Sequence, residues 1–300
     1  MPSRVEVKPK LHLTINDNKG LNMQISLEKL PVSERLGLIE ELWSSIISDR
    51  QSLKDIEDIT PTSSQKELIK LLDKYLSEYA ENKFYNRFII EQIMGSRGIT
   101  RLCHFTPIQN LESILTNGLY PRDYIDEYLP EVKCPDDNRA DRMRNGVCLS
   151  VSFPNNKMFF QKRNDCIDVE EWAVIILDAR EVLLKYDCAF FPSNAASGIY
   201  RNRPLSDFMT SSAFYALFEH KVETCKNPIE RNSKLDDKYP TDVQAEVIVF
   251  DHISSDAIIG CQLQGDKQLK YLEENFPQFK FKAIFGADQS FASRDWFLGI

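Results

Sequence analysis

The spacing of hydrophobic residues divides the chain into two parts. Residues 5–15 and 21–27 alternate apolar and polar positions on either side of the turn-forming segment NDNKG, which predicts a β-hairpin. Two segments with apolar residues at three- to four-residue spacing follow, at residues 31–46 and 61–79, and each predicts an amphipathic helix. We therefore expect a small unit of one hairpin and two helices over residues 1–83.

Residues 84–300 show a mixture of short apolar strands and short helices. Two polar segments, residues 120–145 and 226–241, are predicted to be long loops, and long loops in compact domains usually carry function. Two of the helices are expected to end at Gly98 and Gly118. The mixture predicts a mixed α+β domain. The predicted strands cover residues 99–105, 147–153, 171–179 and 244–253, and the predicted helices cover residues 88–98, 107–119 and 206–222.

The composition indicates a protein of the cytoplasm. The 300 residues are 42% hydrophobic, and no apolar run reaches the roughly 18 residues of a membrane span. The N-terminus lacks the apolar stretch of a secretory signal. Seven scattered cysteines and only four histidines indicate reduced thiols without a zinc site. We therefore expect no membrane association and no bound metal.

The charge distribution limits how the protein could meet nucleic acid. A net charge of −8 argues against a protein that coats nucleic acid without specificity. Basic residues nevertheless outnumber acidic ones from Lys133 to Arg163. This segment predicts a local phosphate-binding face, with an ordinary solvated surface as the alternative.

A polar pair begins an otherwise apolar strand near the C-terminus. In the segment YPTDVQAEVIVF, Gln244 and Glu246 precede a run of apolar residues. Alternation along a strand would place both side chains on one face. Burying a carboxylate is costly unless it has a partner or a task. Glu246 is therefore a candidate functional residue, with a strand end that meets solvent as the alternative.

Four segments resemble, in their order and separation, the DarT-type DNA ADP-ribosyltransferase toxins of bacterial toxin–antitoxin systems. They are RGITRLCHFTPIQNLESILTNGL, LSVSFPNNKMFF, DCAFFPSNAAS and YPTDVQAEVIVF, and the resemblance runs from about Tyr85 to about Asp266. It implies a split β-core with an NAD cleft, in which ADP-ribose passes from NAD to a base of single-stranded DNA. NAD is then a substrate, and the implied partners are single-stranded DNA and an antitoxin protein.

The resemblance also implies roles for individual residues. Glu246 occupies the position of the catalytic carboxylate, which can stabilise an oxocarbenium-like transition state. Arg142 matches the essential arginine of the family, whose guanidinium can hold pyrophosphate oxygens. His104, Phe105 and Thr106 form the HFT motif, whose counterparts bind NAD.

Four more residues are candidates for the same site. Ser113, on the helix after the HFT motif, and Met158 are candidate NAD-binding residues, and a core position is the alternative for Met158. Gln244 would recognise the acceptor base through its amide. Arg144 is a candidate DNA contact, and Arg139 lies near enough in the sequence to be confused with Arg142.

The N-terminal unit has a resemblance of its own. Residues 23–79 resemble the antitoxin components of bacterial addiction modules, a strand followed by two amphipathic helices, and a helical cap on the main domain is the alternative. The division into domains is expected at residue 83. Two other functions stay open: an ADP-ribosyltransferase that acts on RNA or protein, and an inactive interaction protein fused to an antitoxin-like module.

Overall fold

The computed structural model divides into two compact units, Met1–Lys74 and Tyr75–Ile300. In the first unit, β1 (His12–Asn16) pairs antiparallel with β2 (Asn22–Ser26), so the predicted hairpin is confirmed. The two predicted N-terminal helices lie outside the described residues, and the predicted domain boundary at residue 83 stays a prediction. The structure describes residues 12–16, 22–26, 83–84, 86–129, 132, 140–166 and 169–300.

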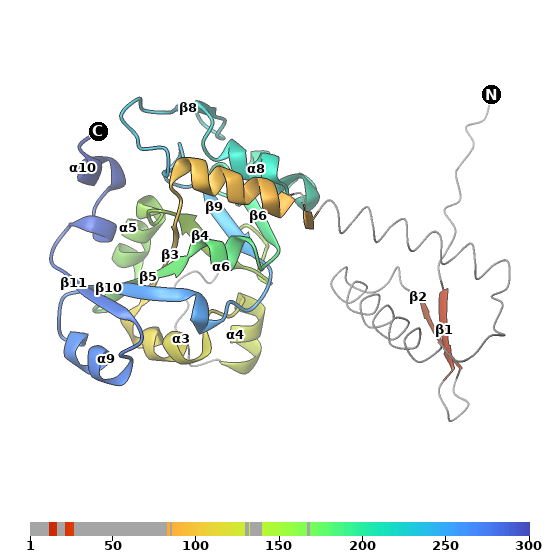
Figure 1. The fold of residues 1–300 in the computed structure, drawn as a ribbon, viewed down its shortest axis with the longest axis horizontal. Helices are drawn as coiled ribbons and strands as arrows, with labels where there is room; N and C mark the ends of the chain where they lie inside the picture. The colour runs from red at the N-terminus through yellow and green to blue at the C-terminus, as the bar shows by residue number, and fades with distance from the viewer. Residues whose placement is uncertain are drawn as a thin grey trace. The chain divides into compact units, whose positions relative to one another are not determined.

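A seven-stranded sheet organises the second unit (Figure 1). Its strand order is β11-β10-β5-β3-β4-β9-β6, and every neighbouring pair is antiparallel except β10 and β11. With helices around this sheet, the predicted mixed α+β class is confirmed. The strands are β3 (Arg101–Pro107), β4 (Val147–Val151), β5 (Trp172–Asp178), β6 (Cys188–Phe191), β9 (Glu246–Val249), β10 (Ile258–Gln264) and β11 (Lys280–Ile284).

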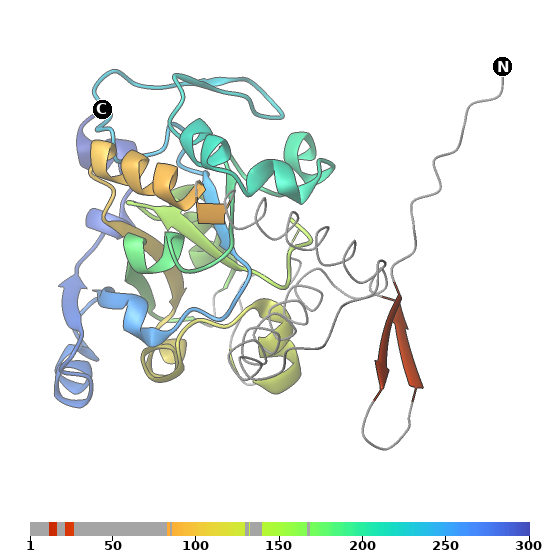
Figure 2. The same ribbon diagram turned by 45° about the vertical axis from the view of Figure 1, so that its right-hand side comes forward.

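Helices cover the sheet and its edges (Figure 2). A helix over residues 86–97 ends at Gly98, and α3 (Leu111–Asn117) ends at Gly118, as predicted. At Gly118 the backbone φ is 86°, and a β-carbon would lie 2.1 Å from the Ile253 carbonyl oxygen, so only glycine fits. The other α-helices are α4 (Arg122–Tyr128), α5 (Asn156–Asp165), α6 (Ala179–Leu183), α7 (Gly198–Arg201), α8 (Ser211–Ala216), α9 (Leu269–Asn275) and α10 (Arg294–Leu298). Among the described residues, none of the helices has the length and apolar character that crossing a membrane requires.

Alternation along β3 sends side chains into two hydrophobic cores. Leu102 belongs to the larger core, to which the 86–97 helix, α3 and α8 also contribute. Cys103 and Phe105 belong to a smaller core, which Phe159 of α5 and Phe291 complete. β5 is buried at every position except Asp178, because its alternating side chains enter the larger core on one face and the smaller core on the other.

The predicted helix over residues 206–222 is confirmed only at α8 (Ser211–Ala216) and is wrong on either side of it. The chain there forms a 3₁₀ turn (Leu205–Phe208), then α8, then the short strand β7 (Lys221–Val222), which pairs with β8 (Ile229–Glu230). Thr210 explains the break, since its backbone is extended and its side chain accepts a hydrogen bond from the Ala213 N–H at 3.1 Å. An N-cap of this kind begins a new helix.

The strand expected over residues 244–253 is shorter than its apolar pattern suggests. Gln244 lies in a turn, where its N–H donates to Asp242 Oδ1 at 3.0 Å, and β9 begins only at Glu246. The expectation that strand alternation places Gln244 and Glu246 on one face is therefore wrong.

The predicted loop over residues 120–145 contains a helix, α4. Pro121 immediately precedes the first turn of α4, and Arg122 pairs with Asp126 one turn later at 2.6 Å. Ion pairs at this spacing stabilise helices. The polar composition of the segment thus reflects an exposed helix as well as loop residues.

Candidate active site

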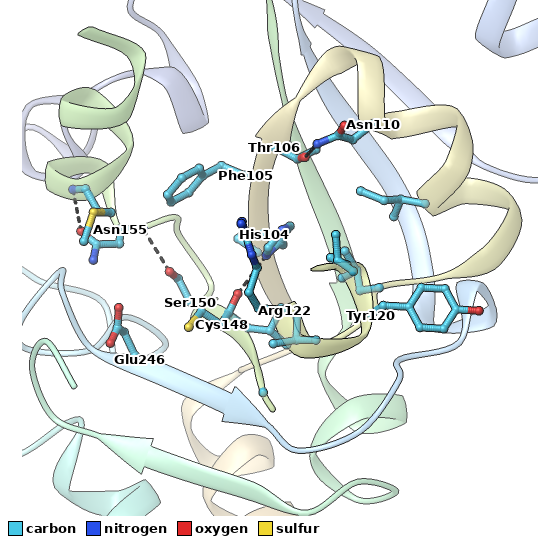
Figure 3. Close-up of a pocket in the computed structure, with 18 of the residues that line it drawn as sticks. His104, Phe105, Thr106, Asn110, Tyr120, Arg122, Cys148, Ser150, Asn155 and Glu246 are labelled. Carbon is cyan, nitrogen blue, oxygen red and sulfur yellow. Dashed lines mark hydrogen bonds between the residues drawn. The ribbon is translucent and has the colours of Figure 1, made fainter. Parts of the chain in front are cut away.

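A cavity of about 300 Å³ opens where β3, β4 and β9 meet α3, α4 and α5 (Figure 3). Six of the residues proposed from the sequence line it: His104, Phe105, Thr106, Ser113, Met158 and Glu246. Segments far apart in the sequence therefore meet at one site.

The carboxylate of Glu246 is held at the edge of this cavity. Glu246 is half-buried at the first position of β9, opposite Phe191 at the last position of β6. The chain leaving β6 turns back, and its Ala195 N–H donates to Glu246 Oε2 at 2.9 Å. Asn194 and Ala196, on either side of this donor, also line the cavity. A carboxylate in this position can stabilise a cation that forms in the cavity.

The ring of His104 is oriented by the neighbouring strand. His104 Nδ1 lies 2.9 Å from the carbonyl oxygen of Cys148 on β4. A carbonyl only accepts, so Nδ1 carries a proton and donates it to this hydrogen bond. Phe105 stacks on Phe159 with ring centroids 4.7 Å apart. The HFT motif thus presents one oriented imidazole and one supported aromatic ring.

Thr106 and Asn110 form a buried polar pair beneath the cavity. Asn110 Nδ2 donates to Thr106 Oγ1 at 3.1 Å, and both side chains are buried. Ser113, one turn farther along α3, is half-buried and accepts from Asn117 Nδ2 at 3.5 Å. The hydroxyls of Thr106 and Ser113 and the amide of Asn110 can serve a ligand with hydroxyl groups.

The start of α5 supplies another wall of the cavity. Asn155 caps the helix by accepting the Met158 N–H at 3.1 Å, and its own N–H donates to Ser150 Oγ at 3.0 Å. Asn155 is 3% exposed, and its Nδ2 has no hydrogen-bond partner among the described residues. The cap and the bond to Ser150 fix Met158 at the cavity wall.

Three residues predicted for the site lie outside the cavity lining. Arg142 is exposed and has a φ of 65°, a left-handed conformation that is uncommon outside glycine, although its neighbour Asp141 lines the cavity. Arg144 is held by two carboxylates of α4, Asp123 at 3.0 Å and Asp126. Gln244 precedes β9 in the turn described above.

Several lining residues were not identified from the sequence. The cations Lys162 and Arg122 line the cavity, and Arg122 also pairs with Asp126. Asn110 and Asn155 were not predicted as site residues, because a polar residue at the start of a helix is usually a cap. The lining thiol of Cys103 is not a nucleophile at neutral pH, since burial raises its pKa to about 12. Among the described residues, no group of three His, Cys, Asp or Glu side chains could hold a metal ion.

Comparison with known proteins identifies a related family. The family model described as "ssDNA thymidine ADP-ribosyltransferase, DarT" matches residues 103–297, more than half of the chain. This match extends beyond Asp266, where the resemblance read from the sequence ended. A comparison with curated protein sequences found no match.

Solved structures of DarT proteins are similar to this chain at low sequence identity. Thermosipho africanus DarTG in complex with ADP-ribose is 15% identical, with a TM-score of 0.42, over 61% of this chain and 50% of that chain. Thermus sp. 2.9 DarT in complex with NAD⁺ is 14% identical, with a TM-score of 0.38, over 62% of this chain and 95% of that one. The complex of the same DarT with ADP-ribosylated ssDNA is 13% identical, with a TM-score of 0.41, over 67% of this chain and 97% of that one. The aligned part of this chain thus spans half the length of the DarTG chain.

Proposed function

The chain belongs to the DarT family of ssDNA thymidine ADP-ribosyltransferases, and from this premise we propose that it transfers ADP-ribose from NAD to thymine in single-stranded DNA. The observation that carries the proposal is the Glu246 carboxylate at the cavity edge, oriented by the Ala195 N–H at 2.9 Å. A carboxylate held in this way is the group that cleavage of a glycosidic bond requires.

The proposed reaction exchanges one bond at the anomeric carbon of NAD. The bond from ribose C1′ to the pyridinium nitrogen breaks, and nicotinamide leaves as a neutral molecule with the bonding electron pair. Thymine N3 attacks C1′, because N1 of thymine already carries the deoxyribose. The proton of N3 passes to the carboxylate of Glu246, which first stabilises the positive charge at C1′.

The cavity residues divide into those that hold NAD and those that meet the acceptor. We assign NAD binding to His104, Phe105, Thr106, Ser113 and Met158, whose hydroxyl, imidazole and apolar groups suit ribose and nicotinamide. We assign the diphosphate to the lining cations Arg122 and Lys162.

Arg142 has a separate proposed role. We propose that it binds the diphosphate when NAD enters, which requires the segment next to Asp141 to change conformation. Two further proposals concern the acceptor: Gln244 contacts the thymine edge, and Arg144 contacts DNA.

Labelled NAD with a series of acceptors tests the proposed function. We expect label on single-stranded DNA that contains thymidine, and none on the same oligonucleotide with N3-methylthymidine, which lacks the attacking nitrogen. Duplex DNA, RNA and protein are offered in parallel. Label on RNA or protein alone would show that this molecule, and not single-stranded DNA, is the acceptor. The absence of nicotinamide release from every mixture would overturn the proposed chemistry.

We further propose that the protein acts in the cytoplasm as a toxin restrained by an antitoxin protein. The support is the resemblance of four segments to toxins of this class, together with the antitoxin-like pattern of residues 23–79. Expression in bacteria should arrest growth, and the Glu246→Ala variant should not. Growth arrest of equal strength by both proteins would separate toxicity from ADP-ribose transfer and overturn this role.

A further inference from the structure

A second, deeper contact joins the two segments that meet at Glu246. Ser193 Oγ donates to Asp242 Oδ2 at 2.5 Å, and these residues are 3% and 1% exposed. Ser193 lies two residues before Ala195, and Asp242 lies four residues before Glu246. The turn that follows β6 is therefore tied to the approach to β9 at two points, one of them the Glu246 carboxylate itself.

The Asp242 side of this contact is rigidly placed. Asp242 Oδ1 accepts the Gln244 N–H at 3.0 Å, so both carboxylate oxygens are hydrogen-bonded. Buried Arg294 donates to the carbonyls of Pro240 at 2.6 Å and Thr241 at 3.4 Å, immediately before Asp242.

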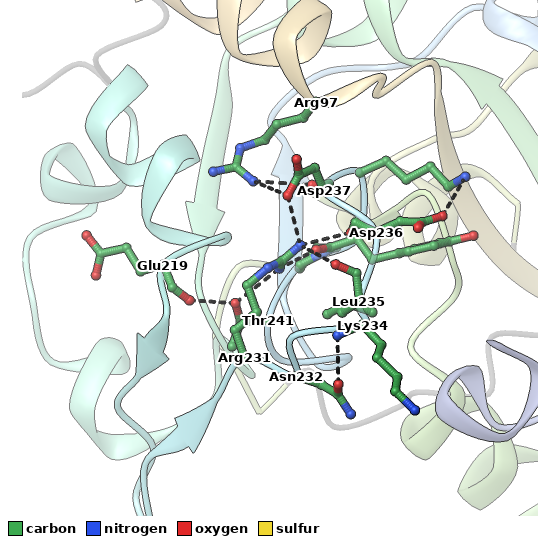
Figure 4. Close-up of polar contacts among 12 residues, drawn as sticks. Arg97, Glu219, Arg231, Asn232, Lys234, Leu235, Asp236, Asp237 and Thr241 are labelled. Carbon is green, nitrogen blue, oxygen red and sulfur yellow. Dashed lines mark hydrogen bonds and ion pairs between the residues drawn. The ribbon is translucent and has the colours of Figure 1, made fainter. Parts of the chain in front are cut away.

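Arg231 holds the same segment from another direction. Its guanidinium donates to the Tyr239 carbonyl at 2.8 Å, the Asp236 carbonyl at 2.8 Å and Thr241 Oγ1 at 3.3 Å (Figure 4). Thr241 Oγ1 in turn donates to the Glu219 carbonyl at 2.6 Å. Asp242 therefore follows a stretch of backbone that two arginines fix.

The Ser193 side is a tight turn that depends on this anchor. Asn194 Oδ1 accepts the Ala196 N–H at 2.8 Å, and the Asn194 carbonyl accepts the Ser197 N–H at 2.9 Å. Ala195 is fully buried between these bonds. The direction of the Ala195 N–H therefore depends on where Ser193 is held, and that N–H helps to orient the Glu246 carboxylate through Oε2.

From these contacts we propose that Ser193 and Asp242 are positioning residues for catalysis, acting on Glu246 through the Ala195 N–H. The proposal rests on the proposed function, because it takes Glu246 as the catalytic carboxylate. A catalytic group must be held within about 0.5 Å of its productive position by such supporting hydrogen bonds. Loss of the tie slows the chemical step and leaves NAD binding in place.

Three variants test the tie. Ser193→Ala and Asp242→Ala are expected to lower kcat at least about tenfold, since a 1 Å misplacement can cost about 100-fold, with the KM for NAD within about twofold. Asp242→Asn is expected to retain most of the activity. Its carbonyl oxygen accepts the Gln244 N–H, and its amide donates to the Ser193 hydroxyl, which can accept. The control Ser290→Ala removes another buried serine, outside the cavity lining, and should change neither constant.

The double variant Ser193→Ala/Asp242→Ala is expected to be no slower than Asp242→Ala alone, because Asp242→Ala already breaks the bond to Ser193. Asp242→Asn as slow as Asp242→Ala would overturn positioning in favour of a direct role for the charge, and full activity of Ser193→Ala would overturn it outright. If Ser193→Ala does not fold, Ser193→Cys is assayed in its place, because a thiol of similar size donates a weaker hydrogen bond.

Nicotinamide release and transfer to DNA are measured in parallel. Wild-type protein that releases no nicotinamide refutes the proposed function, whereas active wild type with unaffected variants refutes only the positioning.

Discussion

Glu246 illustrates how a single carboxylate is made available for chemistry in a sheet protein. It lies at the first position of β9, directly after a turn, and its side chain lines the cavity. One of its oxygens, Oε2, accepts from a backbone N–H, which orients the group without adding another charge. A conservative substitution can therefore separate position from charge.

The substitution Glu246→Gln tests the role of that charge. The amide oxygen of the introduced glutamine can still accept the Ala195 N–H, so the position is kept and the negative charge is lost. We expect kcat for transfer to fall by about 100- to 1,000-fold, because the charge acts mainly on the transition state. The Kd for NAD, measured by calorimetry, should change less than about threefold.

Glu230→Gln is the matched control for this substitution, because Glu230 is exposed on β8 and outside the cavity lining. Its kinetic constants should equal those of the wild type. Transfer by the Glu246→Gln variant at the wild-type rate would rule out Glu246 as the catalytic group.

Buried cysteines should make the stability of the fold fall at alkaline pH. Burial raises the pKa of the Cys103 and Cys261 thiols from 9.0 to about 12 and also raises the pKa of Cys188. Above pH 9 the unfolded chain loses these protons while the folded chain keeps them, so the free energy of unfolding falls as pH rises from about 9 to about 12. Urea denaturation between pH 7 and pH 10.5 should show this fall, and replacing Cys261 with Ser or Ala should reduce its slope. An unchanged slope in both variants would contradict the assignment.

At the scale of the elements, the segment from residue 231 to residue 242 determines how β9 enters the sheet. Arg231 and Arg294 together bind the carbonyl oxygens along this segment, so it is an ordered connection despite its polar sequence. Burial also lowers the pKa of Arg231 from its usual value. A polar composition alone therefore does not predict a mobile loop.

Replacing Arg231 with Ala should destabilise the fold measurably. The substitution removes the Arg231 donor from the carbonyl of Tyr239, and Tyr239 is 4% exposed. An unpaired buried carbonyl costs on the order of 1–3 kcal/mol, so we expect a loss of about 2 kcal/mol in the free energy of unfolding by urea denaturation. Lys234→Ala, an exposed cation of the same segment, should change it by less than about 0.5 kcal/mol. Equal effects of the two substitutions would argue against the anchoring role.

The sequence predicts the elements of this site better than their contacts. β3 and β5 were identified from the apolar residues in their sequences, and the HFT motif places His104 and Thr106 on β3. The contact from Ala195 to Glu246 spans 51 residues and depends on the pairing of β6 with β9, which no local pattern encodes. Asn155 was missed for the same reason, since only the fold brings α5 to the cavity, and Lys162 was identified only as part of the basic segment from Lys133 to Arg163.

At the scale of the whole molecule, the question is which parts the catalytic unit needs in order to fold. The helix of residues 86–97 belongs to it, because Ile90, Ile93 and Met94 lie in the larger core. Asn86 Oδ1 also accepts the Ser211 N–H at 2.9 Å, which joins this helix to the start of α8. Every described residue of the cavity lies after this helix in the sequence.

A chain truncated to begin at Lys83 should therefore fold and keep its NAD site. It retains the whole 86–97 helix, and Lys83 itself pairs with Asp187 at 2.8 Å. A chain that begins at Ile99 is the control. It loses three buried side chains worth about 1.5–3 kcal/mol each and should be insoluble or unfolded by circular dichroism. If the chain starting at Lys83 also fails to fold, the catalytic unit extends further towards the N-terminus than we expect.

The folded truncated chain then shows what the N-terminal unit does. If the N-terminal unit acts as an antitoxin-like module, removing residues 1–82 should change DNA modification or growth inhibition clearly, by about fivefold or more, since regulatory coupling is typically worth about 1–3 kcal/mol. Adding the separate 1–82 peptide back should restore the behaviour of the full chain. Both proteins are assayed at equal concentration with labelled NAD and thymidine-containing single-stranded DNA, and their melting temperatures are compared. Equal activity and equal thermal stability would identify the unit as a passive appendage and refute the antitoxin analogy.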